Sequence, residues 1–322
     1  MKTILRTFVG CTAILFGTAC MGAVKYVPEN MKVKLSLKVP GNNAVNYKLH
    51  PDKLENSYFD YEWRSDNKLP ITVFHKVEER DSCMRLTVQL TAAQDVYFNY
   101  RQLLSTGYRH DNCQFYMPGF WYRRNLRSPK KAPSFHTSDS WLVREDRLSA
   151  PLTGIFSEKE KRFMTVNRLD DFSMDALATH KEGEIILSGK TSLGFTGFEN
   201  QQGIAMLSFG FPYREAPKSY IRKLTLAPEV EAFQLMKKGE SVLLTWEIME
   251  SGADDFSDFI QHTWEHCYDT YAPKPVENSY SIADMKQVLS CFFVNSLVDN
   301  QPLVYNSGIH LKVSDCERNG QA

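Results

Sequence analysis

Apolar and polar residues alternate along short segments through most of the chain. Val33, Leu35, Leu37 and Val39 show this period of two most clearly, and the segments 71–77 and 84–90 repeat it. Further short apolar segments follow at 96–100, 162–166, 184–187, 204–211, 220–226 and 241–248. Turn residues separate these segments, which is typical of antiparallel strands. Nine candidate strands without long helices between them predict a mainly β fold, a large antiparallel β-sandwich.

The period changes from two to between three and four at about residue 251. Ser251 and the acidic pair Asp254-Asp255 precede an apolar stripe of helical spacing, formed by Phe256, Phe259, Ile260, Trp264, Cys267 and Tyr271. The proline-rich segment 271–276 interrupts this helix. A second stripe follows, formed by Ile282, Met285, Leu289, Phe292 and Phe293. The pattern therefore predicts two C-terminal helices, each needing a surface to cover its apolar side.

The first 23 residues have the pattern of a secretory signal. Lys2 and Arg6 precede an apolar run over 8–16 and small residues over 17–23. The run is shorter than the roughly 20 apolar residues that span a bilayer. Cleavage after Ala23 would release a soluble protein, whereas cleavage before Cys20 would give a lipoprotein. We expect a periplasmic or extracellular protein, with membrane contact only through a lipid on Cys20.

Charge and cysteine usage exclude some classes of function. The 38 basic and 38 acidic residues balance, which argues against a phosphate-driven nucleic-acid binder. Export would permit a disulfide, and Cys83 with Cys113 is the pair that flanks strand-like segments; isolated thiols are the simpler interpretation. No CxxC motif is present, so the sequence predicts no cysteine zinc site and no cofactor.

Aromatic rings crowd the segment 115–125, FYMPGFWYRRN, around a Pro-Gly turn. Exposed rings can stack on the C–H faces of sugars, and arginine or asparagine can bind hydroxyls or a uronate carboxylate. The segment 136–147 has the same composition. The candidate substrate-binding residues are Trp121, Tyr122, Arg123, Arg124, Asn125, Trp141, Arg144 and Asp146. The alternative is that the rings belong to the core and the charges form ordinary surface pairs.

Two patterns raise the question of catalysis. Glycoside hydrolysis usually needs two carboxyl groups about 5–9.5 Å apart. Carboxylates are available at Asp139, Glu145, Asp146, Asp170 and Asp171, but the sequence gives no separation and names no catalytic residue. His262-Thr-Trp-Glu-His266 matches H-x-x-E-H, so a zinc metalloprotease using His262, Glu265 and His266 is a minor alternative. Because Trp264 belongs to the apolar stripe of a short helix, surface histidines are the favoured interpretation and we expect no metal.

The order of segments resembles the amino-terminal half of a bacterial six-hairpin glycosidase. The resemblance rests on the charge-rich strand 235–248, the helix 255–268 and the proline break 273–275. It covers about residues 25–300 and concerns the order of these segments along the chain. It implies a galactose-mutarotase-like supersandwich over 24–250, a linker helix over 251–272 and the start of a helical domain over 273–322. The resemblance also implies that the rest of a catalytic helical barrel is missing, together with any catalytic carboxylates that it holds.

Two functional hypotheses follow. The first is an exported carbohydrate-active protein, the sandwich part of a glycoside hydrolase that acts on polysaccharide and packs against a missing helical barrel. The second is a complete surface lipoprotein that binds glycans without catalysis. In both hypotheses the partner is an oligo- or polysaccharide.

Overall fold

Strands dominate the computed structural model, which describes residues 30–54, 60–80, 83–126, 131–170, 182–222, 225–274 and 280–295. The predicted leader with Cys20, as well as Asp171 and Cys316, lies outside these residues. The elements are β1 (Met31–Lys38), β2 (Val45–Lys53), β3 (Asp60–Arg64), β4 (Ile71–Arg80), β5 (Cys83–Ala92), β6 (Val96–Arg109), β7 (Cys113–Met117), β8 (Trp121–Arg123), β9 (Trp141–Arg144), β10 (Leu152–Ser157), β11 (Arg162–Arg168), β12 (Gly183–Ile186), β13 (Phe195–Gln201), β14 (Ile204–Phe211), β15 (Arg214–Arg222), β16 (Thr225–Met236), β17 (Ser241–Gly252), α1 (Phe256–Tyr271) and α2 (Ile282–Asn295). The mainly β class and the two C-terminal helices are confirmed.

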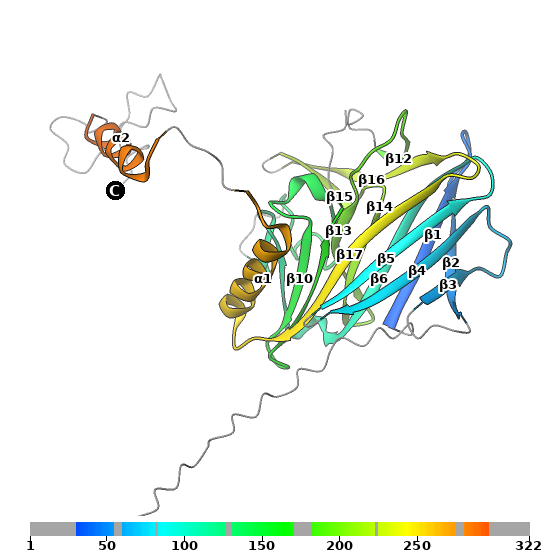
Figure 1. The fold of residues 1–322 in the computed structure, drawn as a ribbon, viewed down its shortest axis with the longest axis horizontal. Coiled ribbons are helices and arrows are strands. Elements are labelled where there is room, and N and C mark those ends of the chain that lie inside the picture. The colour runs from blue at the N-terminus through cyan, green and yellow to red at the C-terminus, as the bar shows by residue number, and fades with distance from the viewer. Residues whose placement is uncertain are drawn as a thin grey trace, which may run out of the picture. The chain divides into compact units, whose positions relative to one another are not determined.

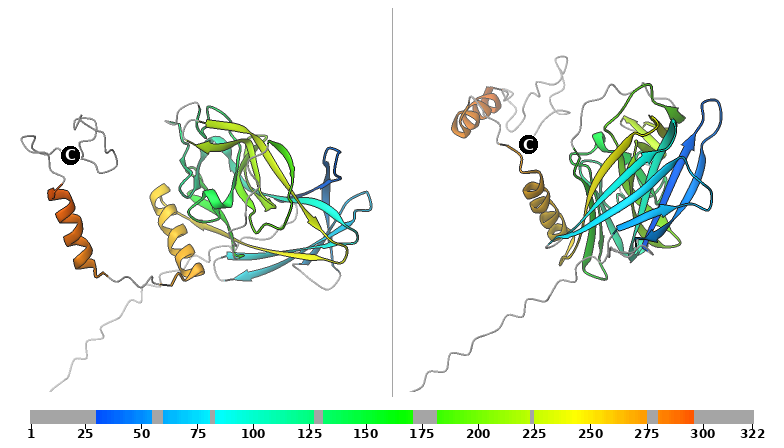
Figure 2. Two further views of the ribbon diagram at one scale, coloured as in Figure 1. Left: turned by 90° about the horizontal axis from the view of Figure 1, so that it is seen from above. Right: turned by 45° about the vertical axis from the view of Figure 1, so that its right-hand side comes forward.

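Two antiparallel ladders share the strand β2 (Figure 1). The first runs β2–β1–β6–β14–β13–β9. The second runs β2–β3–β4–β5–β17–β11–β10–β7–β8. Among the strands that the structure describes, β12 and β16 form the parallel pair. The views of Figure 2 show the strands wrapping around a common interior.

The apolar residues of the two ladders meet in one core. Val33 and Leu35 of β1 are buried there, while Lys32 and Lys34 alternate with them on the opposite face. Trp246 of β17 lies 6.3 Å from Tyr100 of β6 between ring centroids. Burial of such rings removes about 150–250 Å² of surface each, so these contacts between ladders account for much of the fold's hydrophobic stabilisation.

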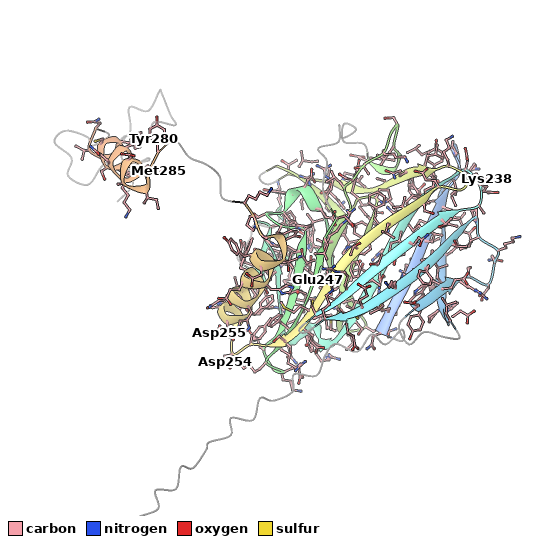
Figure 3. All side chains as sticks on the ribbon, in the orientation of Figure 1. Lys238, Glu247, Asp254, Asp255, Tyr280 and Met285 are labelled. Atoms are coloured by element: carbon pink, nitrogen blue, oxygen red, sulfur yellow. The ribbon has the colours of Figure 1, made fainter. Side chains whose placement is uncertain are left out.

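Helix α1 begins at a side-chain cap and buries one stripe. Asp255 Oδ1 accepts hydrogen bonds from the backbone N–H groups of Ser257 (2.7 Å) and Asp258 (2.9 Å), and these bonds lower the pKa of Asp255. Figure 3 labels Asp254 and Asp255 where the chain leaves β17, the strand that carries Glu247. The buried stripe consists of Phe256, Phe259, Thr263 and Cys267.

The predicted stripe of α1 is therefore corrected at three positions. Trp264 and Tyr271 are 39% and 40% exposed, and Thr263 is fully buried. Thr263 can take a place in the stripe because its hydroxyl donates to the carbonyl of Phe259 at 2.7 Å, which satisfies the polar group inside the protein.

Gly154 of β10 lets α1 approach the sheet. A Cβ at this position would lie 2.6 Å from Phe259 Cζ and 3.1 Å from Thr165 Cγ2. We therefore expect Gly154→Ala to destabilise the protein by about 1–3 kcal/mol, because Phe259 must move out of a packed site. Urea unfolding measures the change, and Gly189→Ala, where a Cβ would meet nothing, is the control. Equal effects of both substitutions would contradict this description of the α1 contact.

Helix α2 belongs to a second unit of the chain, residues 266–322, which is distinct from residues 1–265. None of the residues of α2 is buried, and its apolar residues Ile282, Leu289 and Phe292 are more than half exposed. Within the described part of the chain, neither helix has the length and apolar character needed to cross a membrane.

The cysteines of the described residues are free thiols. Cys83, Cys113, Cys267 and Cys291 are all unbridged, so the pairing of Cys83 with Cys113 is wrong and the isolated-thiol interpretation is correct. Cys113 is buried in β7, where its Sγ donates to the carbonyl of Arg109 at 3.2 Å. Burial raises the pKa of both Cys83 and Cys113 to about 12, so neither is a reactive thiolate at neutral pH.

Candidate functional site

Two of the predicted substrate-binding residues, Trp121 and Trp141, lie in the core. Both are completely buried, and their ring centroids are 6.1 Å apart. Trp121 also packs edge-to-face on Phe135 (4.9 Å) and Phe198 (5.1 Å). The indole N–H of Trp141 donates to the carbonyl of Ser138. Neither indole presents a face to a ligand, which corrects the prediction: these rings anchor the sheet.

Strand β8 and the loop that follows it separate the predicted residues into an outer pair on the strand and an inner pair on the loop. Arg124 points inward, where Nη1 donates to the carbonyls of His110 (3.1 Å) and Cys113 (3.0 Å). Asn125 Nδ2 donates to the carbonyl of Pro133 at 2.7 Å. These two residues hold the loop in place, and Tyr122 and Arg123 remain exposed.

The backbone of this loop is strained at Arg123 and Asn125. Their φ angles are +55° and +48°, in the left-handed region that residues with a Cβ rarely adopt. Asparagine tolerates this conformation better than arginine does. Strain of this kind costs about 1–3 kcal/mol and persists where the surroundings impose it, as they often do at functional sites.

Tyr122 meets Trp264 of α1 over a shared buried ring, Tyr116. The rings of Tyr122 and Tyr116 are 5.4 Å apart in a T-shaped arrangement, and Trp264 Nε1 donates to the Tyr116 hydroxyl at 2.6 Å. Tyr122 is 53% exposed and Trp264 39%. Arg123 lies beside them, with its guanidinium 5.0 Å from the centroid of Phe256. We call the exposed residues Tyr122, Arg123 and Trp264 the Tyr122 surface.

Arg144 and Asp146 form a group of their own. The guanidinium donates twice to the carboxylate, from Nε to Oδ1 at 2.5 Å and from Nη2 to Oδ2 at 3.0 Å. Arg144 is buried and lies 5.4 Å from the centroid of the Tyr213 ring. Burial raises the pKa of Tyr213. Asp146 already binds two donors of the Arg144 guanidinium. The pair therefore has a structural role, and it does not present these donors to a ligand.

Four of the carboxylates considered for hydrolysis lie in the described residues, and each of the four has a partner of its own. Asn200 donates to Asp139 at 2.6 Å, and Arg144 holds Asp146. Arg168 lies between Glu145 (2.7 Å) and Asp170 (2.9 Å). These carboxylates therefore neutralise arginines or accept internal hydrogen bonds, and they do not face a common open cleft as an acid–base pair would.

The residues of the H-x-x-E-H motif make contacts along the helix surface. His262 Nε2 lies 3.5 Å from Asp258 Oδ1, and Gln261 Nε2 donates to Glu265 Oε1 at 2.9 Å. Within the described residues, no converging set of three metal-ligating atoms includes His262 or Glu265. The geometry thus favours the surface-histidine interpretation for His262, and it shows no site that uses His262 and Glu265 together.

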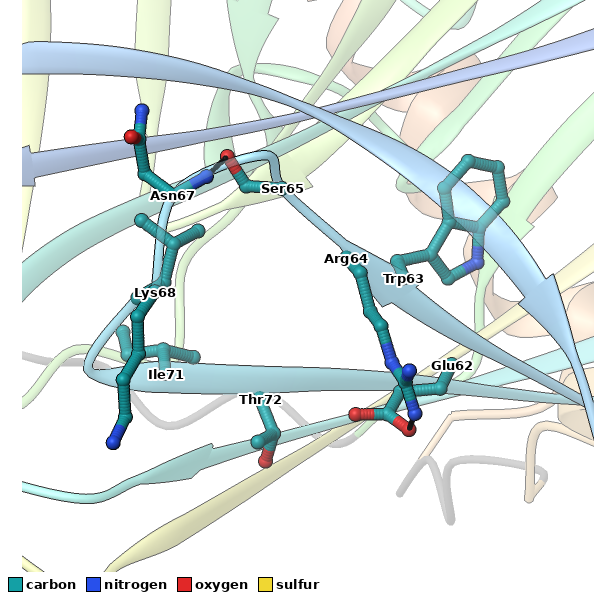
Figure 4. Close-up of a pocket in the computed structure, with 9 residues that line it drawn as sticks. Glu62, Trp63, Arg64, Ser65, Asn67, Lys68, Ile71 and Thr72 are labelled. Atoms are coloured by element: carbon teal, nitrogen blue, oxygen red, sulfur yellow. Dashed lines mark hydrogen bonds and ion pairs between the residues drawn. The ribbon is translucent and has the colours of Figure 1, made fainter.

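A pocket of about 260 Å³ lies between the end of β3 and the start of β4 (Figure 4). Polar side chains line most of it, and Figure 4 shows Arg64 and Lys68 on opposite sides. Arg64 is held by Asp52 (2.9 Å) and Glu62 (2.8 Å). The indole of Trp63 packs towards His75, with ring centroids 5.0 Å apart, so the pocket has no exposed aromatic face.

Comparisons with known proteins find remote structural likenesses. No family model matches the chain, and no curated protein matches it. A polysaccharide lyase shows 13% identity over 73% of this chain and 27% of its own, with a TM-score of 0.35. The GH36 α-galactosidase AgaA from Geobacillus stearothermophilus shows 12% identity over 68% and 30% of the two chains, with a TM-score of 0.38. A galactose mutarotase-related enzyme from Lactobacillus acidophilus shows 8% identity over 68% and 79%, with a TM-score of 0.37.

These neighbours are carbohydrate-active enzymes. This chain spans less than a third of the length of the lyase and of the α-galactosidase. Their TM-scores all lie below 0.5, so the likenesses do not establish the activity of this chain, and its site is argued from its own residues.

Proposed function

We propose that this chain is an exported carbohydrate-active protein that binds polysaccharide through the Tyr122 surface. The proposal includes secretion directed by residues 1–23. It also includes an arrangement of the strands as a galactose-mutarotase-like supersandwich, of the kind that precedes the helical barrel in six-hairpin glycosidases. Glycan binding is the role we assign to the described residues, since Asp139, Glu145, Asp146 and Asp170 are already engaged with internal partners.

The observation that carries the proposal is a pair of exposed rings whose polar atoms are already bound inside the protein. Trp264 donates its indole N–H to Tyr116, and the Tyr122 hydroxyl accepts the backbone N–H of Gly119 at 3.2 Å. Each ring is therefore fixed in orientation while part of it stays open to solvent. A ligand that stacks on such rings loses little affinity to ordering of the side chains.

The surroundings of the rings favour a sugar over other flat ligands. Arg123 adds exposed hydrogen-bond donors next to the rings, and these suit hydroxyls or a carboxylate. Pyranose rings present C–H groups on one face and hydroxyls at the edge, which matches an aromatic face bordered by a polar group. A nucleic acid would call for a basic excess, and the chain has 38 residues of each sign.

We expect Tyr122→Ala and Trp264→Ala each to weaken glycan binding about tenfold. A well-placed ring contact contributes about 0.5–1.5 kcal/mol beyond the area that it buries, and 1.4 kcal/mol is tenfold in affinity. Isothermal titration with a panel of neutral and acidic oligosaccharides measures the change.

Two further variants separate stacking from stability. Trp264→Phe keeps an aromatic face but loses the bond to Tyr116 that orients the ring, so its affinity should lie between those of the wild type and Trp264→Ala. Tyr280→Ala removes a more exposed ring, 63% exposed, that is not part of the Tyr122 surface, and it should leave binding unchanged. Unchanged affinity in Tyr122→Ala and Trp264→Ala, with wild-type folding, would refute the proposal.

A further inference from the structure

Three cations stand directly opposite one another on neighbouring strands. The register places Lys34 of β1 opposite Lys48 of β2 on one side and opposite Arg101 of β6 on the other. Directly opposed residues share a face of the sheet, with Cβ atoms about 4.5–5.5 Å apart, and like charges in such positions are destabilising. Val33 and Leu35 face the core, so this cationic row lies on the opposite face of the sheet.

Lys34, at the centre of the row, lacks a compensating carboxylate. Among the described residues it has neither a hydrogen-bond nor an ion-pair partner, and it is only partly exposed. Burial is the largest of the causes that lower the pKa of Lys34 to about 8, and the other causes are four nearby cations: Arg101, Arg214, Lys48 and Lys32. A half-buried ammonium among like charges is costly unless an anion neutralises it.

The neighbouring carboxylates are held by the arginines. Glu199 pairs with Arg101, and Glu231 and Glu229 lie 3.4 Å and 3.8 Å from Arg214. Burial also lowers the pKa of Arg101 to about 9, with Arg214 as the next contribution. Lys34 and the four cations around it thus outnumber the three carboxylates, and the region is locally positive in a chain of balanced charge.

We propose that the row Lys48–Lys34–Arg101 binds an oxyanion carried by an acidic polysaccharide, namely the carboxylate of a uronic acid residue. This inference rests on the proposed glycan-binding function and extends it to a second contact on another part of the sheet. The row supplies donors one strand spacing apart, about 4.7–4.9 Å, which suits a chain that carries anionic groups at intervals. Lysine supplies a compact charge for such a carboxylate, so Lys34 and Lys48 are the direct contacts, and Arg101, already paired with Glu199, adds positive potential beside them.

The test combines a site-specific measurement with a polymer titration. The Cε resonance of Lys34, assigned by comparison with Lys34→Met in ¹³C-lysine-labelled protein, reports its pKa. Sodium sulfate, polygalacturonate, dextran sulfate and neutral dextran are added in turn.

We expect polygalacturonate to raise the pKa of Lys34, because an adjacent anion favours the charged form. We expect Lys34→Met to weaken polygalacturonate binding at least about tenfold. Lys68→Met, which removes an exposed lysine of the β3–β4 loop, should have no such effect.

The outcomes distinguish this inference from the proposed function. A pKa of Lys34 that no anion shifts, or equal affinities of Lys34→Met and the wild type, would overturn the anion site. A response to dextran sulfate without one to polygalacturonate would replace the carboxylate by a sulfate ester and overturn the uronate assignment. If Tyr122→Ala leaves all glycan binding intact while Lys34 still responds to polygalacturonate, the proposed Tyr122 surface fails and the anion site stands.

Discussion

Replacing Arg168 by methionine is expected to lower the free energy of unfolding by about 3–5 kcal/mol, because the change leaves a buried carboxylate without its counter-charge. Arg168 Nη1 lies 2.7 Å from Glu145 Oε2, and both side chains are almost completely buried. The backbone N–H of Gly194 also donates to Oε2 at 2.7 Å, but Oε1 has no hydrogen-bond partner among the described residues. Burial raises the pKa of Glu145, whereas the charge of Arg168 acts in the opposite direction. The ionised form of Glu145 is therefore stabilised by Arg168.

A matched control lies at the other end of the same strand. Arg162 of β11 pairs with Glu250 at 3.0 Å, but its side chain is 40% exposed, so Arg162→Met should cost only about 0–1 kcal/mol. Urea unfolding compares the two variants. The double substitution Arg168→Met with Glu145→Met should be less harmful than Arg168→Met alone, since it removes both buried charges. An Arg168→Met variant as stable as Arg162→Met would show that the pair contributes no more than a surface contact.

His75 is expected to make the protein sensitive to acid. It is fully buried in β4, and Nε2 donates to the hydroxyl of Tyr100 at 2.9 Å, which in turn donates to Gln102 Oε1 at 2.7 Å. Burial lowers the pKa of His75 from 6.5 to about 3. Between these values the unfolded chain binds a proton that the native state does not, so stability falls as the pH falls. The slope is about 1.4 kcal/mol per pH unit.

Urea unfolding at several pH values between 4 and 7 measures this slope. His75→Gln, which can still donate to Tyr100, should be less stable at pH 7 but should lose the part of the acid sensitivity that comes from this histidine. His50→Gln, which changes an exposed histidine of β2, should keep the wild-type slope. A wild-type slope in His75→Gln would mean that other groups cause the acid sensitivity.

The regular strands were predictable because their alternation reflects burial. Val33 and Leu35 alternate with Lys32 and Lys34, and β1 follows this pattern. The short strands β7 and β9 escaped prediction because almost every residue in them is buried, as in Trp141–Arg144. A continuously apolar segment has no period of two, and it resembles a loop as much as a strand.

The site was only partly predictable, since core packing and sugar stacking use the same side chains. Trp121 and Tyr122 are neighbours in sequence, yet one is fully buried and the other is more than half exposed. The helical spacing places Trp264 in the apolar stripe of α1. In the structure Thr263 is buried in that stripe, and the indole ring of Trp264 stays partly exposed. The cationic row around Lys34 depends on the register between strands far apart in sequence, which no local pattern reveals.

The most direct test of the central claim is an NMR titration that follows the indole N–H of Trp264. Its resonance is assigned by its absence from the spectrum of Trp264→Phe, and the protein is then titrated with the oligosaccharide that binds best in the calorimetric panel. The account predicts that this resonance and the ring resonances of Tyr122 shift together and saturate at the calorimetric affinity. Saturable glycan binding that leaves both residues unshifted and perturbs resonances elsewhere, such as those of the β3–β4 pocket, would contradict it.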